Sequence, residues 1–311
     1  MSAVPRLIVI LGPTASGKSS LGISLAEKLG GEILVCDSTQ VYRHFDIGTA
    51  KVPAAEQRGI RHHLVDLVEP DAIFTAGEFR SLALAALEDV TSRGRPAILT
   101  AGTGLYLRAL LEGLADAPTR SEELRERLRR AASRHGDEYL HRLLARLDPE
   151  SAGRIATRDA QKIIRALEVR LLTGKPVGEI HRQGRSALAG YSITKIGLNP
   201  PREALYARIN ARTEAMLTAG WLDEVRSLVG AGISSDAKPF QFIGYSELRS
   251  HLEGRASLAE AIEQIQRATR QFAKRQITWF RREQGVQWLA GFGDDPLVIS
   301  SASELLEASL G

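Results

Sequence analysis

The segment that most directly indicates chemistry is residues 12–19, GPTASGKS. It matches the P-loop pattern G-x-x-x-x-G-K-[S/T], and it lies between an apolar run and an amphipathic segment. In such a loop, backbone N–H groups and a helix N-terminus hold an anion, Lys18 reaches the terminal phosphates and Ser19 can bind Mg²⁺. The motif does not specify which phosphate ester binds. The residues that we predict to bind a diphosphate or polyphosphate are Gly12, Pro13, Thr14, Ala15, Ser16, Gly17, Lys18 and Ser19.

A second candidate is Asp37, which directly follows the apolar run 33–36. If that run is a parallel strand, Asp37 stands at its carboxyl end, where open parallel sheets bind their ligands. P-loop kinases use a carboxylate at such a position to bind Mg²⁺ or to activate a nucleophile. Taken alone, Asp37 is more simply interpreted as a turn aspartate or as the N-cap of a helix.

The elements that must position these residues follow from the hydrophobic pattern. Continuous branched apolar runs indicate buried parallel strands, and apolar residues at helical spacing indicate amphipathic helices. Strands are predicted at 7–11, 33–36, 97–100 and 191–198. Helices are predicted at 18–29, 81–93, 158–172, 201–220 and 257–282, and everything after 198 is predicted to be helical.

Strands and helices therefore alternate at first, and residues 121–172 are then helical in pattern, without a convincing strand. Such alternation predicts the α/β class, here a P-loop NTPase-like parallel sheet flanked by helices, with a mainly helical insertion domain. We expect the core to comprise residues 1–111 and 186–311, and the insertion to comprise residues 112–185.

The composition excludes several classes of protein. The chain has 311 residues, of which 43% are hydrophobic and 25% charged, values that argue against intrinsic disorder. Cys36 is the only cysteine, so a disulfide framework is excluded. No apolar run is long enough for a membrane span, and the N-terminal segment lacks the features of a signal peptide, so we expect a cytoplasmic protein. We expect the adjacent His62 and His63 to be structural, because neighbouring residues on a strand face opposite sides.

Among the 41 lysine and arginine residues, arginine predominates, since only 8 are lysine. Arginine suits phosphate and stacked bases, but a GC-rich genome produces the same bias. Cationic and aromatic residues also alternate on the predicted helix 257–282, where a solvated face, core packing and contact with nucleic acid all remain open. The residues concerned are Arg267, Arg270, Lys274, Arg275, Trp279, Phe280, Arg281 and Arg282.

A series of sequence blocks carries a family resemblance that covers residues 7–290. The blocks are GPTASGKS, DSTQVY, DIGTAK, HHLVD, AGTGLY, RDAQKIIRALEV, RTEAML, IGY and TRQFAKRQITWF. In this order they resemble the bacterial tRNA dimethylallyltransferases, also called tRNA isopentenyltransferases. A generic P-loop kinase would not show DSTQVY, DIGTAK or TRQFAKRQITWF.

The resemblance implies a transferase that modifies tRNA. A dimethylallyl group would pass from dimethylallyl diphosphate to the exocyclic N6 of the adenine 3′ of the anticodon, in tRNAs reading codons that begin with U, with release of diphosphate. The implied partner is the tRNA anticodon stem-loop, the implied cofactor is Mg²⁺, and a monomer is expected. Three alternatives remain open: an adenylate-type isopentenyltransferase acting on a free nucleotide, a P-loop small-molecule kinase and a non-catalytic RNA-binding protein.

The resemblance also implies roles for individual residues. Asp37 matches the general base, Thr14 a hydroxyl beside the bond that breaks, and Arg212 a diphosphate-binding arginine. The residues that match tRNA-contacting positions are Asp37, Ser38, Thr39, Gln40, Thr103, Arg125, Gln161, Lys162, Ile163, Ile164, Arg165, Gln241, Phe242, Ile243, Gly244, Tyr245 and Ser246.

Overall fold

The chain is organised into two compact units. A computed structural model describes residues 4–115, 117–136, 138–182 and 186–308. One unit combines Met1–Leu110 with Ala189–Gly311, and the other is Leu111–Leu188. The expected end of the insertion, residue 185, lies outside the described residues.

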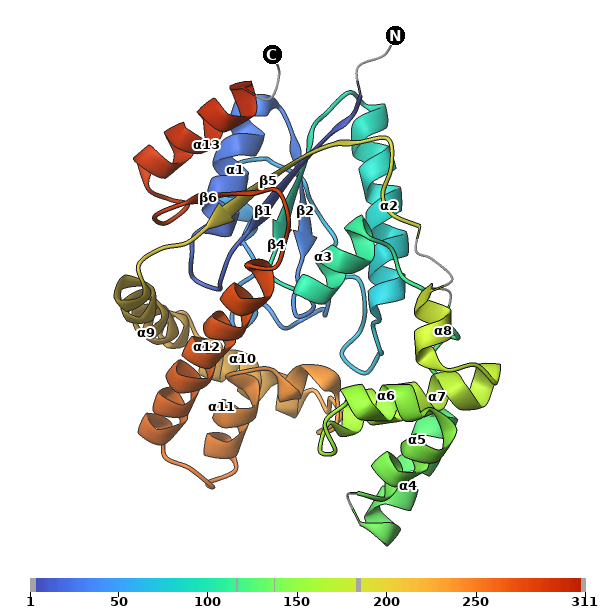
Figure 1. Ribbon diagram of the computed structural model, residues 1–311. Coiled ribbons are helices and arrows are strands. Elements are labelled where there is room, and N and C mark those ends of the chain that lie inside the picture. The colour runs from blue at the N-terminus through green and yellow to red at the C-terminus, as the bar shows by residue number, and fades with distance from the viewer. Residues whose placement is uncertain (1–3, 116, 137, 183–185, 309–311) are drawn as a thin grey trace. The chain divides into compact units, whose positions relative to one another are not determined.

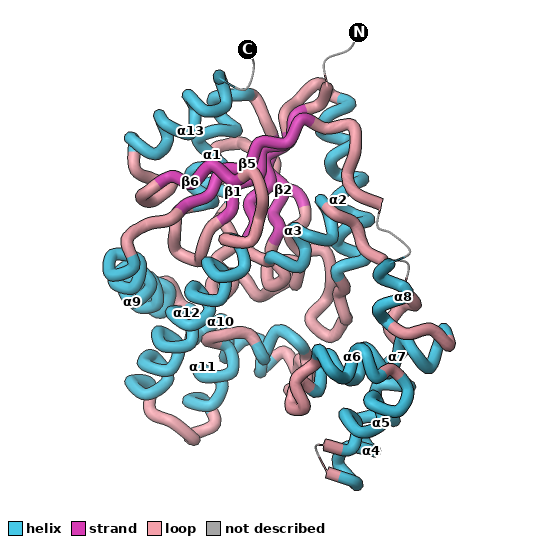
Figure 2. Tube along the Cα trace, in the orientation of Figure 1, coloured by secondary structure: helices cyan, strands magenta, loops and turns pink. Residues whose placement is uncertain are grey.

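The first unit is built on a parallel six-stranded sheet, shown in magenta in Figure 2. The strands lie side by side in the order β3 (His62–His63), β2 (Glu32–Cys36), β4 (Ala97–Ala101), β1 (Arg6–Leu11), β5 (Ser192–Leu198) and β6 (Val286–Leu289). This sheet confirms the predicted α/β class. The prediction that everything after 198 is helical is wrong at β6, because this edge strand has only four partly exposed residues and therefore no continuous apolar run.

Helices α1 (Lys18–Leu29), α2 (Ala76–Ser92) and α13 (Pro296–Ala308) pack against this sheet. Helices α9 (Arg202–Thr218), α10 (Trp221–Gly230), α11 (Tyr245–Leu252) and α12 (Leu258–Phe280) pack on one another below it (Figure 1). Helix α3 (Gly104–Leu111) follows β4, and short 3₁₀ turns lie at Ala54–Glu56 and Lys238–Gln241. Helix α2 begins before the predicted residue 81, because Thr75 and Glu78 form a capping box at its N-terminus. No helix in the described part of the chain combines the length and the apolar character that crossing a membrane requires.

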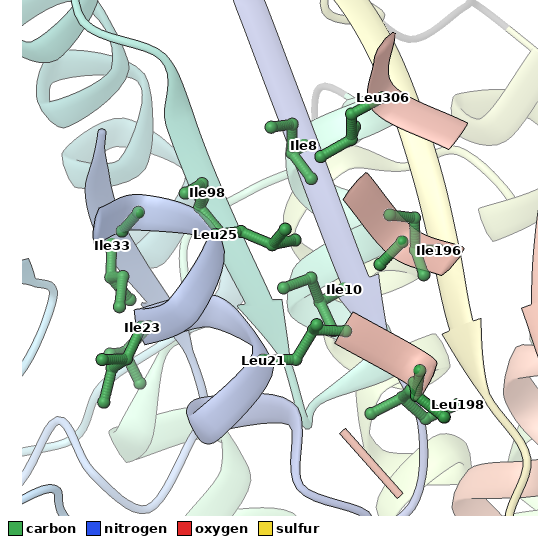
Figure 3. Packing of buried hydrophobic residues seen from close by; sticks show 14 residues of the cluster. Ile8, Ile10, Leu21, Ile23, Leu25, Ile33, Ile98, Ile196, Leu198 and Leu306 are labelled. Carbon is green, nitrogen blue, oxygen red and sulfur yellow. The ribbon is translucent and has the colours of Figure 1, made fainter. Parts of the chain in front are cut away.

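The packing of the core explains why the sequences of the central strands are unbroken apolar runs. Helices α1 and α13 cover one face of the sheet, where Leu25 and Leu306 pack against Ile8 and Ile196 (Figure 3). Helix α2 packs on β2 and β4 and buries its own apolar stripe, which includes Phe79. Because both faces of the central strands are covered, successive residues of β1 are buried regardless of the side they face.

A buried carboxylate anchors the edge of the sheet opposite the strand ends that carry Asp37. Glu32, at the start of β2, is 2% exposed and accepts hydrogen bonds from Arg93 at 2.9 Å, from Arg95 at 3.1 Å and from His63 at 2.7 Å. The hydrogen bond from Arg93 is the main reason that the pKa of Glu32 falls to about 2. His62 bonds to the Ile60 carbonyl, so the two histidines have separate structural partners.

In its described part, the second unit consists of helices joined by loops and has no strand. Its helices are α4 (Glu122–His135), α5 (Tyr139–Leu147), α6 (Pro149–Arg154), α7 (Ala160–Thr173) and α8 (Val177–Arg182). Leu128 of α4, Leu144 of α5 and Leu167 of α7 meet in one apolar cluster. The unit thus has a hydrophobic core of its own.

Candidate active site

The two chemical candidates from the sequence meet at one edge of the sheet. In the parallel register, Leu11 of β1 and Cys36 of β2 both pair with Ala101 of β4, so these three strands end at the same level. The P-loop begins directly after β1, and Asp37 directly follows β2. Carboxyl ends of adjacent parallel strands form the usual ligand crevice of such sheets. The topology therefore brings a phosphate cradle and a carboxylate together.

The P-loop has the shape of an anion cradle. Lys18 donates a hydrogen bond to the Pro13 carbonyl at 2.7 Å, which folds its side chain back over the loop. Gly17 caps α1 with φ 86°, and a Cβ there would lie 2.7 Å from the backbone nitrogen of Gly293. A side chain at position 17 is thus excluded by both conformation and space. The first turn of α1 directs its unpaired N–H groups and its partial positive charge into this cradle.

Three charged groups influence one another across the site. Burial lowers the pKa of Lys18 to about 8, with Asp37 opposing this shift and Arg212 adding to it. Burial also lowers the pKa of Arg212, whose charge is opposed by nearby Arg208 and favoured by Asp37. Arg212, on α9, has no hydrogen bond or ion pair with the residues that the structure describes. Its guanidinium therefore has donors available for an anion in the cradle.

The Asp37 carboxylate is held by one oxygen only. Its Oδ1 accepts hydrogen bonds from the Thr39 backbone N–H at 2.8 Å and from Thr39 Oγ1 at 2.7 Å. Its Oδ2 has no hydrogen-bond partner within the described ranges. Thr103, in the turn after β4, fixes the same turn, since its Oγ1 accepts the Ser38 backbone N–H at 2.9 Å. The carboxylate is therefore oriented and still has one oxygen free to accept a proton.

Gln40 is held in place by the turn that contains Thr49 and Ala50. Its Nε2 donates to the carbonyls of Thr49 at 3.0 Å and Ala50 at 3.3 Å. Glu224 of α10 holds the start of that turn by accepting the Ile47 N–H at 2.7 Å, and it also accepts the Tyr245 hydroxyl at 2.6 Å. The sequence analysis missed Glu224 as a contributor to the site, because in the sequence it is one acidic residue among several after RTEAML.

The expected tRNA-contacting block 241–246 divides into exposed and buried residues. Gln241 and Ser246 are exposed. Tyr245 is 0% exposed and packs against Phe45 and Trp221, and a Cβ on Gly244 would overlap the Trp221 ring. The protein encloses the Tyr245 side chain and Gly244, so Gln241 and Ser246 offer the exposed side chains of this block, and tRNA contact by the block stays a prediction.

The second unit contains the other expected tRNA contacts, Arg125 and the block 161–165. Gln161 and Lys162 are exposed, whereas Ile163 and Ile164 are buried in the apolar cluster, and tRNA contact by this block stays a prediction. Arg125 forms a two-pronged ion pair with the buried Glu168, with both N–O distances 2.8 Å. Although burial raises the pKa of Glu168, the hydrogen bonds from Arg125 and Arg165 outweigh it and lower that pKa to about 2. Both arginines therefore have a structural partner.

Helix α12 has one face packed in the core and another that is exposed and cationic. Phe280 and Ala273 face inward and are 0% exposed. On the outer side, an open groove of about 440 Å³ is lined by Gln271, Lys274, Arg275, Thr278, Trp279 and Arg282. Arg108 of α3 lies over the Trp279 ring, with 4.8 Å between its Cζ and the ring centroid. The helix thus combines core packing with a cationic groove.

Comparisons with known proteins agree on one family. A family model described as IPP transferase matches residues 40–283. A Solibacter usitatus protein named tRNA dimethylallyltransferase is 50% identical over 306 residues, which is 98% of this chain and 99% of that protein. The structure of a tRNA isopentenylpyrophosphate transferase from Bacillus halodurans matches with 37% identity and a TM-score of 0.72, covering 98% of this chain and 96% of that one. A eukaryotic dimethylallyltransferase acting on tRNA matches with 27% identity and a TM-score of 0.81, covering 98% and 77%.

Proposed function

The chain belongs to the IPP transferase family, and from this premise we propose that it transfers a dimethylallyl group from dimethylallyl diphosphate to tRNA, releasing diphosphate. The observation that carries the proposal is the meeting of the P-loop and Asp37 at one edge of the sheet. A diphosphate ester held by the loop presents its reactive carbon toward a carboxylate. That is the arrangement required for transfer to a nucleophile that must lose a proton.

The donor is held through its diphosphate. Backbone N–H groups of the P-loop and the N-terminus of α1 bind the phosphate oxygens, and Lys18 adds a charge. Arg212 neutralises the negative charge that grows on the leaving group, because a guanidinium fork can bind two of its oxygens. We assign the Thr14 hydroxyl to the oxygen of the bond that breaks. These residues therefore stabilise the departing diphosphate more strongly than the intact ester.

We propose that the acceptor is the exocyclic N6 of the adenine 3′ of the anticodon, in tRNAs reading U-initial codons. The nitrogen lone pair attacks C1 of the dimethylallyl group as the C1–O bond breaks, and the bonding electrons leave with the diphosphate. Asp37 takes the proton from N6 through Oδ2, while Thr39 holds Oδ1. The adenine must leave its stack to reach this site, as bases modified on their edges do.

A divalent cation fits this site when it is shared with the substrate. The Ser19 hydroxyl is exposed in the first turn of α1 and has no hydrogen-bond partner among the described residues. No three His, Cys, Asp or Glu side chains of the described residues form a metal site. Mg²⁺ commonly takes one or two protein oxygens and completes its shell with phosphate oxygens and water. We propose that Ser19 holds Mg²⁺, which supplies positive charge to the diphosphate.

The macromolecular acceptor is supported by the placement of exposed cations and polar groups. Ser38, Thr39, Gln40 and Thr103 surround Asp37 and suit contacts to the target nucleotide. Lys274, Arg275 and Arg282 line the groove on α12 and suit phosphates of the anticodon stem-loop. On this proposal the enzyme works in the cytoplasm, where its tRNA acceptor is found. It works as a monomer, because one chain carries both the donor loop and Asp37.

One assay tests this function. Dimethylallyl diphosphate labelled in the dimethylallyl group is incubated with the enzyme, Mg²⁺ and either unmodified tRNA, AMP, ATP or no acceptor. We expect label in tRNA alone. Label in AMP or ATP would instead identify an adenylate-type isopentenyltransferase, and phosphate transfer from ATP without label incorporation would identify a kinase. A tRNA with guanine in place of the target adenine is the matched control, because it has no N6 amine.

A further inference from the structure

A buried glutamine joins the two halves of the site. Gln276, on the inner face of α12, is 6% exposed. Its Oε1 accepts the Thr14 backbone N–H at 2.7 Å, and its Nε2 donates to the Gly102 carbonyl at 2.8 Å. Thr14 and Gly102 lie 262 and 174 residues away from Gln276 along the chain. Both polar ends of the amide are therefore used, and their roles fix which end is oxygen and which is nitrogen.

Each end of this amide touches a segment with a different task. Thr14 lies in the loop that cradles the anion. Gly102 lies directly against the Asp37 carboxylate, since a Cβ built on Gly102 would be 2.5 Å from Asp37 Oδ2. Gly102 is itself tied to the end of β2, because its N–H donates to the Cys36 carbonyl at 3.0 Å. Gln276 thus connects the donor loop, through Gly102, to the strand end that carries Asp37.

We propose that Gln276 is a positioning residue that fixes the separation between Thr14 and Asp37; the proposal rests on the function proposed above. A neutral amide is required here, because one end must accept a hydrogen bond and the other must donate one. A carboxylate would place a negative charge against the Gly102 carbonyl, and an apolar side chain would leave two buried backbone groups unpaired. Because Gln276 occupies the Thr14 N–H, Thr14 acts on the donor through its hydroxyl.

A fixed separation between Thr14 and Asp37 should affect the rate of transfer more than the binding of dimethylallyl diphosphate. Reacting groups must be held near their attack geometry, and a small displacement costs more in the transition state than in the bound ground state. Loss of the Gln276 amide should therefore lower kcat, while the KM for dimethylallyl diphosphate changes little. A residue that only stabilised the fold would not lower kcat selectively and leave KM unchanged.

The test uses Gln276→Glu, whose side chain has the same size and can mimic the amide only when protonated. A carboxylic acid retains one acceptor and one donor, whereas a carboxylate has no donor for Gly102. We expect the single-turnover rate of the variant, divided by that of the wild type, to fall about tenfold or more between pH 6 and pH 9. The ionisable groups around the site, Asp37, Lys18, Arg212 and Cys36, are present in both proteins, so their contribution to any pH dependence cancels in this ratio. Gln264→Glu, exposed on the same helix, is the control and should give a constant ratio.

A second variant has a side chain at position 276 that does not ionise. Gln276→Met keeps the length of the side chain and should lower kcat about tenfold or more at every pH, with KM for dimethylallyl diphosphate within about threefold. Melting temperatures confirm that each protein is folded at each pH. A pH-independent ratio for Gln276→Glu, or a Gln276→Met variant with near-normal kcat, overturns the inference. A wild type that transfers no label to tRNA overturns the proposed function and this inference with it, so the two failures are distinguishable.

Discussion

The Asp37 carboxylate lies so close to Gly102 that a Cβ on Gly102 would stand 2.5 Å from Asp37 Oδ2. The carboxylate cannot turn away freely, because Thr39 holds Oδ1 through two hydrogen bonds. Position 102 therefore has to be a glycine for Asp37 to keep its orientation. The relationship links a turn after β4 to the chemistry at the end of β2.

Gly102→Ala should impair catalysis without unfolding the protein. The added methyl group displaces Oδ2, and misplacement of a catalytic group lowers the rate by about tenfold to a hundredfold. Single-turnover transfer of label to tRNA measures this effect. Gly104→Ala is unsuitable as a control because it would strike Trp279, whereas Gly153→Ala meets nothing within 4 Å and should leave the rate unchanged.

Asp37→Asn should abolish most of the activity while both substrates still bind. An amide of the same shape cannot accept the N6 proton, and loss of a general base costs about 10²- to 10⁴-fold in rate. Single-turnover kinetics with saturating tRNA and donor give the rate, and filter binding gives the tRNA affinity. Normal turnover by this variant with both substrates bound would contradict the proposed role of Asp37.

The affinity for inorganic diphosphate should depend on the charge of Lys18. The pKa of Lys18 is lowered to about 8, so the side chain is charged at pH 7 and becomes neutral as the pH rises through 8. Lys18→Met has no such charge and shares every other titration, including that of the ligand. The ratio of wild-type to variant affinity should therefore fall about tenfold from pH 7 to pH 9. Isothermal titration calorimetry measures it, and a constant ratio would show that Lys18 is not titrating in this range.

Arg125→Lys should weaken the second unit more than it weakens tRNA binding. Lysine cannot reproduce the two-pronged pairing with the buried Glu168, and we expect a loss of about 1–3 kcal/mol in the free energy of unfolding. Hydrogen exchange of α4 and α7 reports this change, and Arg127→Lys, exposed on the same helix, is the control. If Arg125 instead contacts a phosphate directly, its replacement by alanine lowers the salt slope of tRNA binding by about one.

Glu32→Gln should destabilise the sheet in a pH-dependent way. A carboxylate whose pKa is lowered to about 2 contributes stability that is present above its ordinary pKa and is lost as the pH falls toward 2. Replacing it should cost about 1–3 kcal/mol at pH 7, because Arg93 and His63 lose a charged partner. The difference from wild type should shrink as the pH falls below about 4.5. Urea denaturation at several pH values measures this, with the exposed Glu56→Gln as control.

Local sequence determined much of the fold and the centre of the site. The apolar runs before Gly12 and Asp37, together with the helical spacing after Lys18, were sufficient to predict strand β1, helix α1 and strand β2. They were sufficient because continuous burial and a 3.6-residue period are properties of short segments. The P-loop was recognisable for the same reason, since its function depends on eight consecutive residues. The two-residue strand β3 and the short edge strand β6 left no such pattern and were missed.

The tertiary structure decided which polar groups meet. Helical spacing marks the inner face of α12, but it does not reveal that Gln276 spans Thr14 and Gly102. Likewise, the helical pattern of residues 121–172 does not reveal that Arg125 pairs with the buried Glu168. A buried hydrogen bond depends on the positions of segments far apart in the chain, and only the packed fold sets those positions. The sequence by itself thus marked the P-loop and Asp37 as candidate site residues, and the fold placed them at one edge of the sheet and decided which side chains hold them.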